Sequence, residues 1–259
     1  MPKIVRIIIN IVFAAALVAA LAAAYIVGSA DRKPILCKGV KIVIADSTVN
    51  QFVTPEEVKK YIDKEYGGYV GMPIDDIDLV KVEAILDEKT AIYKSEAYTT
   101  KDSLLNISIT QRRPIVRFQK GDKGFYADAD GFLFPLQSTY ASYVQIIDGA
   151  IPLKNEHGYR GTPETDEEKL WLRRMIDLVK YIEGSRKWKD VIVQISVGED
   201  GNLILVPRKG KEKFIFGHPT EIESKFEKME LYYKAIAPAK EEGRYRSVDL
   251  RFDGQIVCR

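Results

Sequence analysis

The sequence has few histidines and cysteines, two residue types that are common in metal sites, disulfide frameworks and catalytic centres. Its 259 residues include only two histidines, His157 and His218, and only two cysteines, Cys37 and Cys258. The formal net charge is +2, and neither a phosphate-binding loop nor a nucleophile–base motif is present. A single Cys37–Cys258 bridge would not amount to a disulfide framework, and two half-buried thiols are the alternative. These absences argue against an enzyme, a bound cofactor or metal, and a nucleic-acid-binding protein.

Long apolar runs are also scarce, and the only one extends from Ile7 to Val27. At the helical rise, its roughly 21 residues span about 30 Å, the thickness of a bilayer's hydrocarbon core. Lys3 and Arg6 precede the run, so the positive-inside rule places residues 1–6 in the cytoplasm and the rest of the chain across the membrane. A cleaved signal peptide ending near Ala22-Ala23-Ala24 is the alternative, although signal peptides usually have only about 7–15 apolar residues. We therefore expect a transmembrane helix at 7–27 and a large exported body.

The exported body begins with a pattern that predicts one small domain, at 38–112. Val40, Ile42 and Ile44 alternate with polar residues, as in a half-buried strand. Thr54-Pro55-Glu56-Glu57 is typical of a helix start, and Val80 is expected on the inner face of a second helix. The expected elements are a strand at 40–44, helices at 55–66 and 75–86, and strands at 92–99 and 104–110. This β-α-α-β-β order resembles a POTRA domain, a module that docks onto polypeptide partners.

Residues 113–259 predict a second domain, a mixed α/β domain with a mainly antiparallel sheet, and the whole chain is therefore of the α+β class. Thr220 and Glu223 have the spacing of a capping box, and Pro238 is expected to end the helix that they begin. Asp253-Gly254 predicts a tight hairpin between the last two strands. The expected helices are at 163–182 and 220–237, and the expected strands are at 115–119, 125–127, 132–134, 191–197, 203–207, 213–216, 247–252 and 255–258.

Four motifs carry a resemblance to a known family. They are QRRPIVRF at 111–118, FYADADGFLFP at 125–135, FIFG at 214–217 and RSVDLRFDGQIVC at 246–258. In this order, behind an N-terminal anchor and a POTRA-like module, the chain resembles the FtsQ/DivIB family of bacterial divisome proteins. The resemblance implies a non-enzymatic scaffold of the cell inner membrane that acts at the division septum from the periplasmic side. It also implies FtsB and FtsL as partners, with FtsK and FtsW as further candidates.

The last predicted hairpin is the candidate partner-binding site. No later strand is expected to pair with 255–258, and an unpaired edge presents free N–H and C=O groups to which an extended peptide can add. The resemblance points to the same place, because the family's partner FtsB docks on this terminal hairpin. The candidate contact residues are Arg251, Phe252, Asp253, Gly254, Gln255, Ile256 and Val257.

Several alternatives stay open at this stage. A POTRA-containing factor for outer-membrane protein assembly or secretion would need tandem POTRA repeats or a β-barrel, and a cell-wall hydrolase would need a catalytic site. Arg112 and Arg113 predict either a basic contact patch or a solvated hinge between the domains. Asp128-Ala129-Asp130-Gly131 predicts a hairpin turn rather than a calcium loop, because the later ligands of such a loop are missing. Tyr232 and Tyr233 are expected to pack on a helix face.

Overall fold

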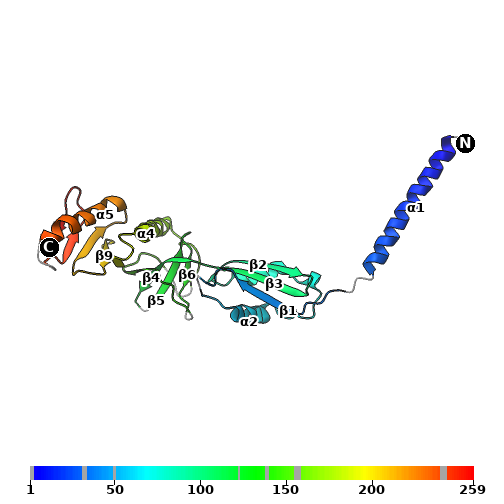
Figure 1. Cartoon of the computed structure of the whole chain (residues 1–259), viewed down its shortest axis with the longest axis horizontal. Coiled ribbons are helices and arrows are strands. Elements are labelled where there is room, and N and C mark those ends of the chain that lie inside the picture. The colour runs from blue at the N-terminus through cyan, green and yellow to red at the C-terminus, as the bar shows by residue number, and fades with distance from the viewer. Residues whose placement is uncertain are drawn as a thin grey trace.

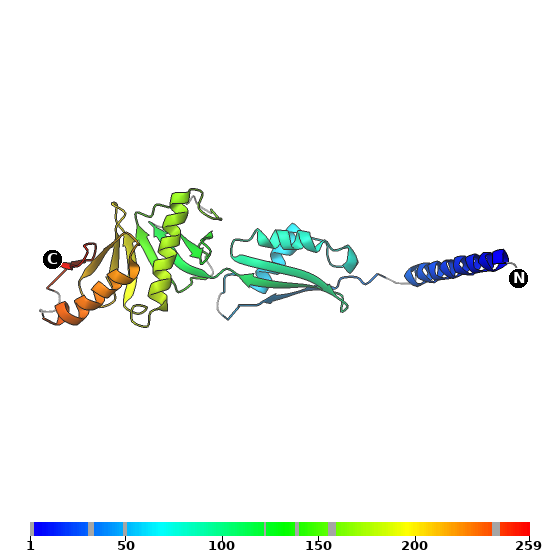
Figure 2. The same cartoon turned by 90° about the horizontal axis from the view of Figure 1, so that it is seen from above.

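The protein is an elongated molecule with a separate N-terminal helix and two folded parts that follow one another along its length (Figure 1). The computed structural model describes residues 3–30, 34–48, 51–121, 123–137, 140–154, 159–239 and 244–259, with side chains only at 10–25 in the first of these ranges. Figure 2, seen from above, shows the same succession of helix, small sheet and large sheet.

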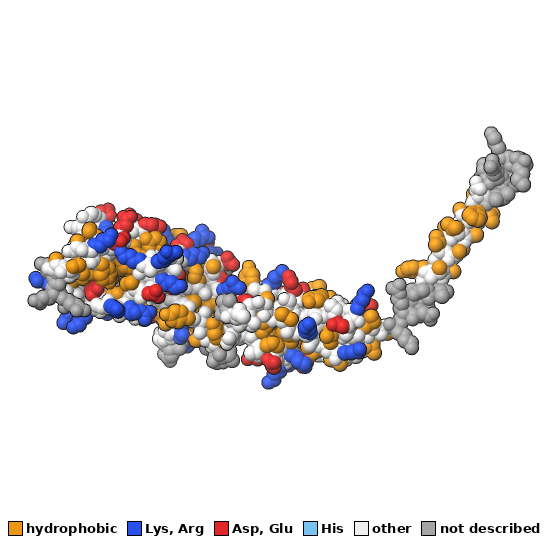
Figure 3. All heavy atoms as spheres, in the orientation of Figure 1, with side chains coloured by type: hydrophobic (Ala, Val, Ile, Leu, Met, Phe, Trp, Pro, Cys, Tyr) orange, Lys and Arg blue, Asp and Glu red, His pale blue; other side chains and the backbone are white. Residues whose placement is uncertain are grey.

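Helix α1, Lys3–Ala30, covers the apolar run. Its described side chains, such as Ile11, Phe13 and Leu17, are exposed and form a mostly hydrophobic surface (Figure 3). The structure describes no side chains for the predicted tail at 1–6. The same is true of both ends of the predicted span at 7–27. Among the residues that are described, no helix has both the length and the apolar character needed to cross a membrane.

The first folded part is a three-stranded sheet with two helices packed on one face. Strands β1 (Gly39–Ile44), β3 (Leu104–Gln111) and β2 (Ile92–Thr100) lie in that order, with β1 parallel and β2 antiparallel to β3. Helices α2 (Pro55–Glu65) and α3 (Leu79–Asp87) share one core with alternate residues of β3. That core includes Val58, Ile62, Val82, Leu86, Leu105, Ile107 and Ile109. The β-α-α-β-β order that the sequence predicts is present.

The start of α2 is as expected, whereas the start of α3 is not. The Glu57 N–H donates to Thr54 Oγ1 over 3.2 Å, and the Thr54 N–H donates to Glu57 Oε2 over 3.0 Å, which completes a capping box. The second helix does not begin at Asp75, because Ile74–Asp76 is a separate 3₁₀ turn and Asp78 caps α3. The inward face shifts accordingly: Val80 is 75% exposed, and Val82 is fully buried.

The second folded part is a nine-stranded, mainly antiparallel sheet in the order β12-β11-β10-β9-β8-β7-β4-β5-β6. Parallel pairing occurs only between β4 and β7, β7 and β8, and β10 and β11, within the strands described. The strands are β4 (Pro114–Lys120), β5 (Lys123–Asp128), β6 (Leu133–Pro135), β7 (Gln145–Gly149), β8 (Ile192–Val197), β9 (Leu203–Pro207), β10 (Lys213–Gly217), β11 (Ser247–Asp249) and β12 (Val257–Cys258).

Helices α4 (Asp166–Gly184) and α5 (Ile222–Leu231) cover one face of the large sheet. Leu172, Met175 and Val179 of α4 and Phe226 and Met229 of α5 belong to one core with the inward residues of the strands. Thr165 and Glu168 form a capping box, so α4 begins at Asp166 rather than at residue 163. Since α4 connects β7 to the parallel strand β8, it provides the crossover that a parallel pair requires.

Helix α5 differs from its prediction at both ends. Its N-cap is Glu221, at φ +53° and without a side-chain cap, so the predicted capping box of Thr220 and Glu223 does not form. At the other end, a π-helical turn (Tyr232–Ile236) and a 3₁₀ turn (Ala237–Ala239) continue the winding past Pro238. Tyr232 is buried and meets Phe214 edge to face at 5.5 Å between ring centroids, so the predicted packing role of the tyrosine pair is confirmed.

An aromatic cluster on the other face of the large sheet joins the two folded parts. Phe52, from the loop before α2, is 2% exposed and lies edge to face with Tyr126, Phe134 and Tyr140. Ala91 completes the buried part of this group. We call Phe52, Ala91, Tyr126, Phe134 and Tyr140 the junction cluster.

Candidate partner-binding site

The last two strands form a shorter ladder than the sequence predicts. Val248 and Asp249 of β11 pair with Cys258 and Val257 of β12, and Ser247 exchanges backbone hydrogen bonds with Arg259. The chain from Leu250 to Ile256 connects the two strands as a loop. The prediction of a two-residue hairpin at Asp253-Gly254 is therefore wrong, although these residues do form a turn within the loop. Two sets of side-chain hydrogen bonds account for the early end of β11.

The first set is a clamp between Asp249 and Arg251. The Arg251 side chain donates from Nε to Asp249 Oδ1 over 2.9 Å and from Nη2 to Oδ2 over 2.7 Å, and its backbone N–H donates to Oδ1 over 3.1 Å. The hydrogen bonds from Arg251 hold the pKa of the Asp249 carboxyl below its usual value. Gly217 lies under the clamp at φ +75°, where an added Cβ would stand 2.8 Å from Arg251 Cγ. The clamp thus depends on a glycine in the neighbouring strand.

The second set comes from α5. Lys228 Nζ donates to the carbonyl of Phe252 over 2.7 Å and to the carbonyl of Leu250 over 3.3 Å. These bonds hold the start of the loop against the helix, so both carbonyls are used within the domain. Phe252 itself stays 42% exposed, so its ring is accessible and is not part of the core.

Strand β12 is the terminal strand of the nine-stranded sheet, and its end of the chain is marked C in Figure 1. Ser247 and Arg259 exchange two backbone hydrogen bonds, of 3.0 and 2.9 Å. Because such pairs alternate along an antiparallel ladder, Val257 and Arg259 direct their N–H and C=O groups toward β11. Cys258, which lies between them, directs its own N–H and C=O groups to the outer side. Among the described residues, no strand pairs with that outer side.

The side chains of β12 alternate in the same way. Cys258 and Ile256 pack against the core beside the helices, whereas Val257 lies on the other face with Asp249. The predicted residues from Arg251 to Gln255 are exposed, and Ile256 and Val257 are partly buried. An added strand would meet the backbone of Cys258 first, and this residue was missing from the sequence prediction. Strand alternation could have identified Cys258, whereas no sequence signal marked Lys228.

The remaining candidates have structural roles. Arg112 is mostly buried, donates from Nη1 to Asp128 Oδ2 over 2.9 Å, and lies 3.5 Å from the Phe132 ring centroid. It is therefore neither a solvated hinge nor a basic patch. Asp128 Oδ1 also accepts the N–H groups of Asp130 and Phe132, so the Asp128–Gly131 segment is a hairpin turn, as expected.

The other polar candidates are placed as follows. Arg113 is exposed, with its Nε 3.7 Å from Asp46 Oδ2. The backbone carbonyl of His218 accepts a hydrogen bond from Lys225 Nζ. His157 lies outside the described residues. Cys37 and Cys258 are free thiols, so the bridge between them is not formed. No group of three or more His, Cys, Asp and Glu side chains that could hold a metal ion is found in the described ranges.

Comparison with known protein families gives two matches. The FtsQ/DivIB, C-terminal related model matches residues 113–259, and the POTRA-like domain model matches residues 35–110. Comparison with curated proteins gives no significant match. The first model covers more than half of the chain and contains the nine-stranded sheet with its terminal strand β12. The chain therefore belongs to the FtsQ/DivIB family of bacterial cell division proteins.

Proposed function

We propose that the protein is a non-enzymatic scaffold of the divisome, which binds FtsB and FtsL through its exported body and holds them at the septum. FtsK and FtsW are further candidate partners, and no nucleic acid is expected. Membership of the FtsQ/DivIB family supports a role in division rather than in outer-membrane protein assembly. The observation that carries the proposal is the terminal strand β12, whose outer side is unpaired among the described residues.

The mode of binding follows from this edge. A partner segment in extended conformation adds to the outer side of β12, exchanging backbone hydrogen bonds with Cys258 and, where the ladder lengthens, with Ile256. The loop from Arg251 to Gln255, which the clamp and Lys228 hold in place, supplies side-chain contacts beside the new strand. Phe252 is the apolar contact in that loop, because its ring is already accessible before binding. Main-chain bonds then give affinity, and the loop gives selectivity.

The direct test removes one outward donor. Cys258→Pro eliminates the N–H group that faces the partner, and Cys258→Ala removes the thiol while keeping that N–H group. We expect the full-length Cys258→Pro variant in detergent to bind a synthetic periplasmic FtsB peptide about tenfold more weakly, a change of about 1.4 kcal/mol. The Cys258→Ala variant should bind within about twofold of the unmodified chain. Equal binding by all three chains, with unchanged thermal melts, would refute strand addition at β12.

The same proposal places the N-terminal helix in the cell inner membrane, with residues 1–6 in the cytoplasm and the C-terminus in the periplasm. The support is the apolar run at 7–27 with Lys3 and Arg6 before it. A C-terminal alkaline phosphatase fusion should be active, and mass spectrometry of the mature protein should find the N-terminal residues retained. A soluble product beginning near Tyr25 would show that the run is a cleaved signal peptide.

Depletion in cells distinguishes the scaffold from the alternative function. Loss of a divisome scaffold blocks septation, so the cells should grow as filaments with normal outer-membrane protein content. A loss of outer-membrane proteins without filaments would instead support the POTRA-containing assembly or secretion factor.

A further inference from the structure

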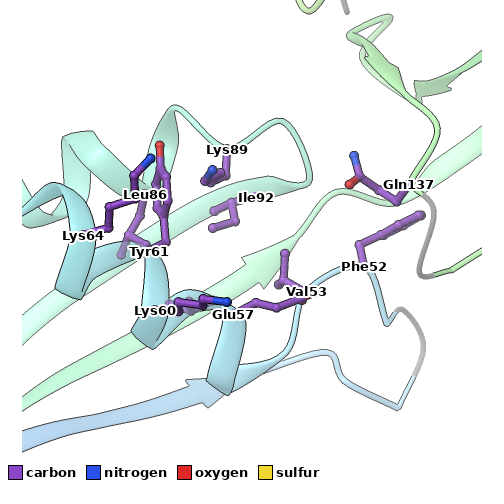
Figure 4. Close-up of a pocket in the computed structure, with 11 residues that line it drawn as sticks. Phe52, Val53, Glu57, Lys60, Tyr61, Lys64, Leu86, Lys89, Ile92 and Gln137 are labelled. Carbon is purple, nitrogen blue, oxygen red and sulfur yellow. The ribbon is translucent and has the colours of Figure 1, made fainter.

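A surface pocket lies far from β12, beside the boundary between the two folded parts. It has a volume of about 400 Å³ and is lined mainly by residues of α2 and its preceding loop, the end of α3, and the start of β2. Gln137 reaches it from the second folded part and Phe52 from the junction cluster, and both stand at one end, opposite Lys64 (Figure 4). We call this hollow the junction pocket. Its volume lies within the range of roughly 300–1,000 Å³ typical of ligand pockets.

The floor of the junction pocket is apolar and its rim is charged. The apolar lining residues, which form the floor, are Val53, Val58, Leu86 and Ile92. The charged lining residues are three lysines and one glutamate, namely Lys60, Lys64, Lys89 and Glu57. The glutamate is already engaged, because Glu57 Oε2 accepts the Thr54 N–H in the capping box. The cavity is therefore an apolar hollow inside a positively charged rim.

The lysines of the rim are largely free to meet a ligand. Lys60 forms no ion pair among the described residues, and Lys64 has only the exposed carboxylate of its chain neighbour Glu65, at 3.1 Å. Lys89 Nζ lies over the Tyr61 ring, 3.2 Å from its centroid, so the cation is held at the mouth by an aromatic face rather than by a carboxylate. Exposed ammonium groups can form ion pairs with the carboxylates of a partner at little desolvation cost.

We propose that the junction pocket binds a short acidic peptide segment of a partner protein, which places one large apolar side chain on the floor and its flanking carboxylates on Lys60, Lys64 and Lys89. An apolar anchor within a polar rim is the arrangement that concentrates binding energy in protein interfaces. The charge of the rim selects glutamate and aspartate beside that anchor and raises the association rate. Because Gln137 lines the cavity together with α2, the bound segment contacts both folded parts. This surface is separate from β12 and does not depend on the function proposed for that edge.

The probe for this site is a fluorescein-labelled peptide with one tryptophan between two pairs of glutamates. Its control is the same peptide with glutamine in place of each glutamate. The protein variant is the full-length chain with Lys60→Glu and Lys64→Glu together. The matched protein control is Lys59→Glu, which also reverses a charge on exposed α2 but lies outside the lining of the pocket. Fluorescence anisotropy in detergent at low salt reports binding, and a thermal melt reports folding.

The unmodified chain and Lys59→Glu should bind the acidic peptide with a Kd of about 100 μM or tighter. The double variant should bind about tenfold more weakly, and the glutamine peptide should lose a similar factor. Salt should weaken binding of the acidic peptide, because the rim charges are exposed to solvent. Equal binding of both peptides, equal binding by the double variant, or no binding by the unmodified chain would each overturn the proposal. FtsB binding at β12 should be unchanged by these substitutions, because the pocket lies apart from β12, so failure here leaves the scaffold function standing.

Discussion

Replacing Phe52 with alanine should uncouple the two folded parts of the chain. The ring is 2% exposed, and its centroid lies 4.9 Å from Tyr140, 5.8 Å from Tyr126 and 6.1 Å from Phe134. A buried phenylalanine truncated to alanine costs about 3–5 kcal/mol, which includes aromatic contacts of about 0.5–1.5 kcal/mol each. Because Phe52 belongs to the first part and its ring partners to the second, we expect the loss to fall on the contact between them.

The assay is chemical and thermal unfolding of the full-length chain in detergent. Phe52→Ala should lower the free energy of unfolding by about 3 kcal/mol and separate the transitions of the two parts. It should also speed proteolytic cleavage near residues 111–122, a range that contains the two residues, 111 and 112, between the two matched regions. The matched control is Phe252→Ala, the same chemical change at a ring that is 42% exposed. That control should change stability by less than about 1 kcal/mol.

For partner binding the order of the two phenylalanine variants should be the reverse of their order for stability. Phe52→Ala should leave FtsB binding at β12 unchanged, whereas Phe252→Ala should weaken it. If Phe52→Ala were no more destabilising than Phe252→Ala, and the transitions stayed together, the junction cluster would not be what couples the two parts.

Three further variants test the clamp and the buried ion pair. Gly217→Ala should destabilise by about 1–2 kcal/mol more than Gly254→Ala, because both replace a glycine at positive φ but only the first adds a collision with the clamp; equal melting temperatures would contradict this. Asp249→Asn should cost stability at neutral pH, and the difference from the unmodified chain should disappear in acid. The reason is that the pKa of Asp249 is lower in the folded state than its unfolded value of about 3.9. The carboxylate therefore stabilises the fold above that value, and this stabilisation is lost as the pH falls through the folded-state pKa. A pH-independent difference in urea unfolding would refute that assignment. Arg112→Met should cost about 3 kcal/mol in the same measurement, because it leaves a buried carboxylate without its cation, and a neutral result would rule out a structural role for the pair.

The periodic elements could be predicted from the sequence because their signals are local. The helix-start pattern at Thr54-Pro55 and the apolar stripe of α4 predict helices that the structure contains, and the alternation in β3 predicts a strand with one buried face. Strand β7 was missed, because only Ile147 combines apolar character with burial, while Ile146 is 40% exposed and Gln145 is buried. Its place between β4 and β8 depends on pairing with distant strands, which a single sequence does not reveal.

The misplaced boundaries have a similar cause. Asp78 rather than Asp75 caps α3, although acidic residues stand at both positions and periodicity alone does not choose between them. The final hairpin has an Asp-Gly signal, yet β11 ends early because Arg251 and Lys228 hold the following residues out of the ladder. The clamp joins Asp249 and Arg251, which are two residues apart, but the contacts of Lys228 join residues that only the fold brings together, so they were not predictable from the sequence.

The central claim, that a partner strand adds to the outer side of β12, is tested most directly by hydrogen exchange at single amides. Without a partner, the N–H groups of Val257 and Arg259 should exchange slowly, because they bond to β11, and that of Cys258 should exchange fast. On saturation with the FtsB peptide, the Cys258 amide should become protected by at least about tenfold, while Val257 and Arg259 change little. Fast exchange at Cys258 in the saturated complex would contradict the account.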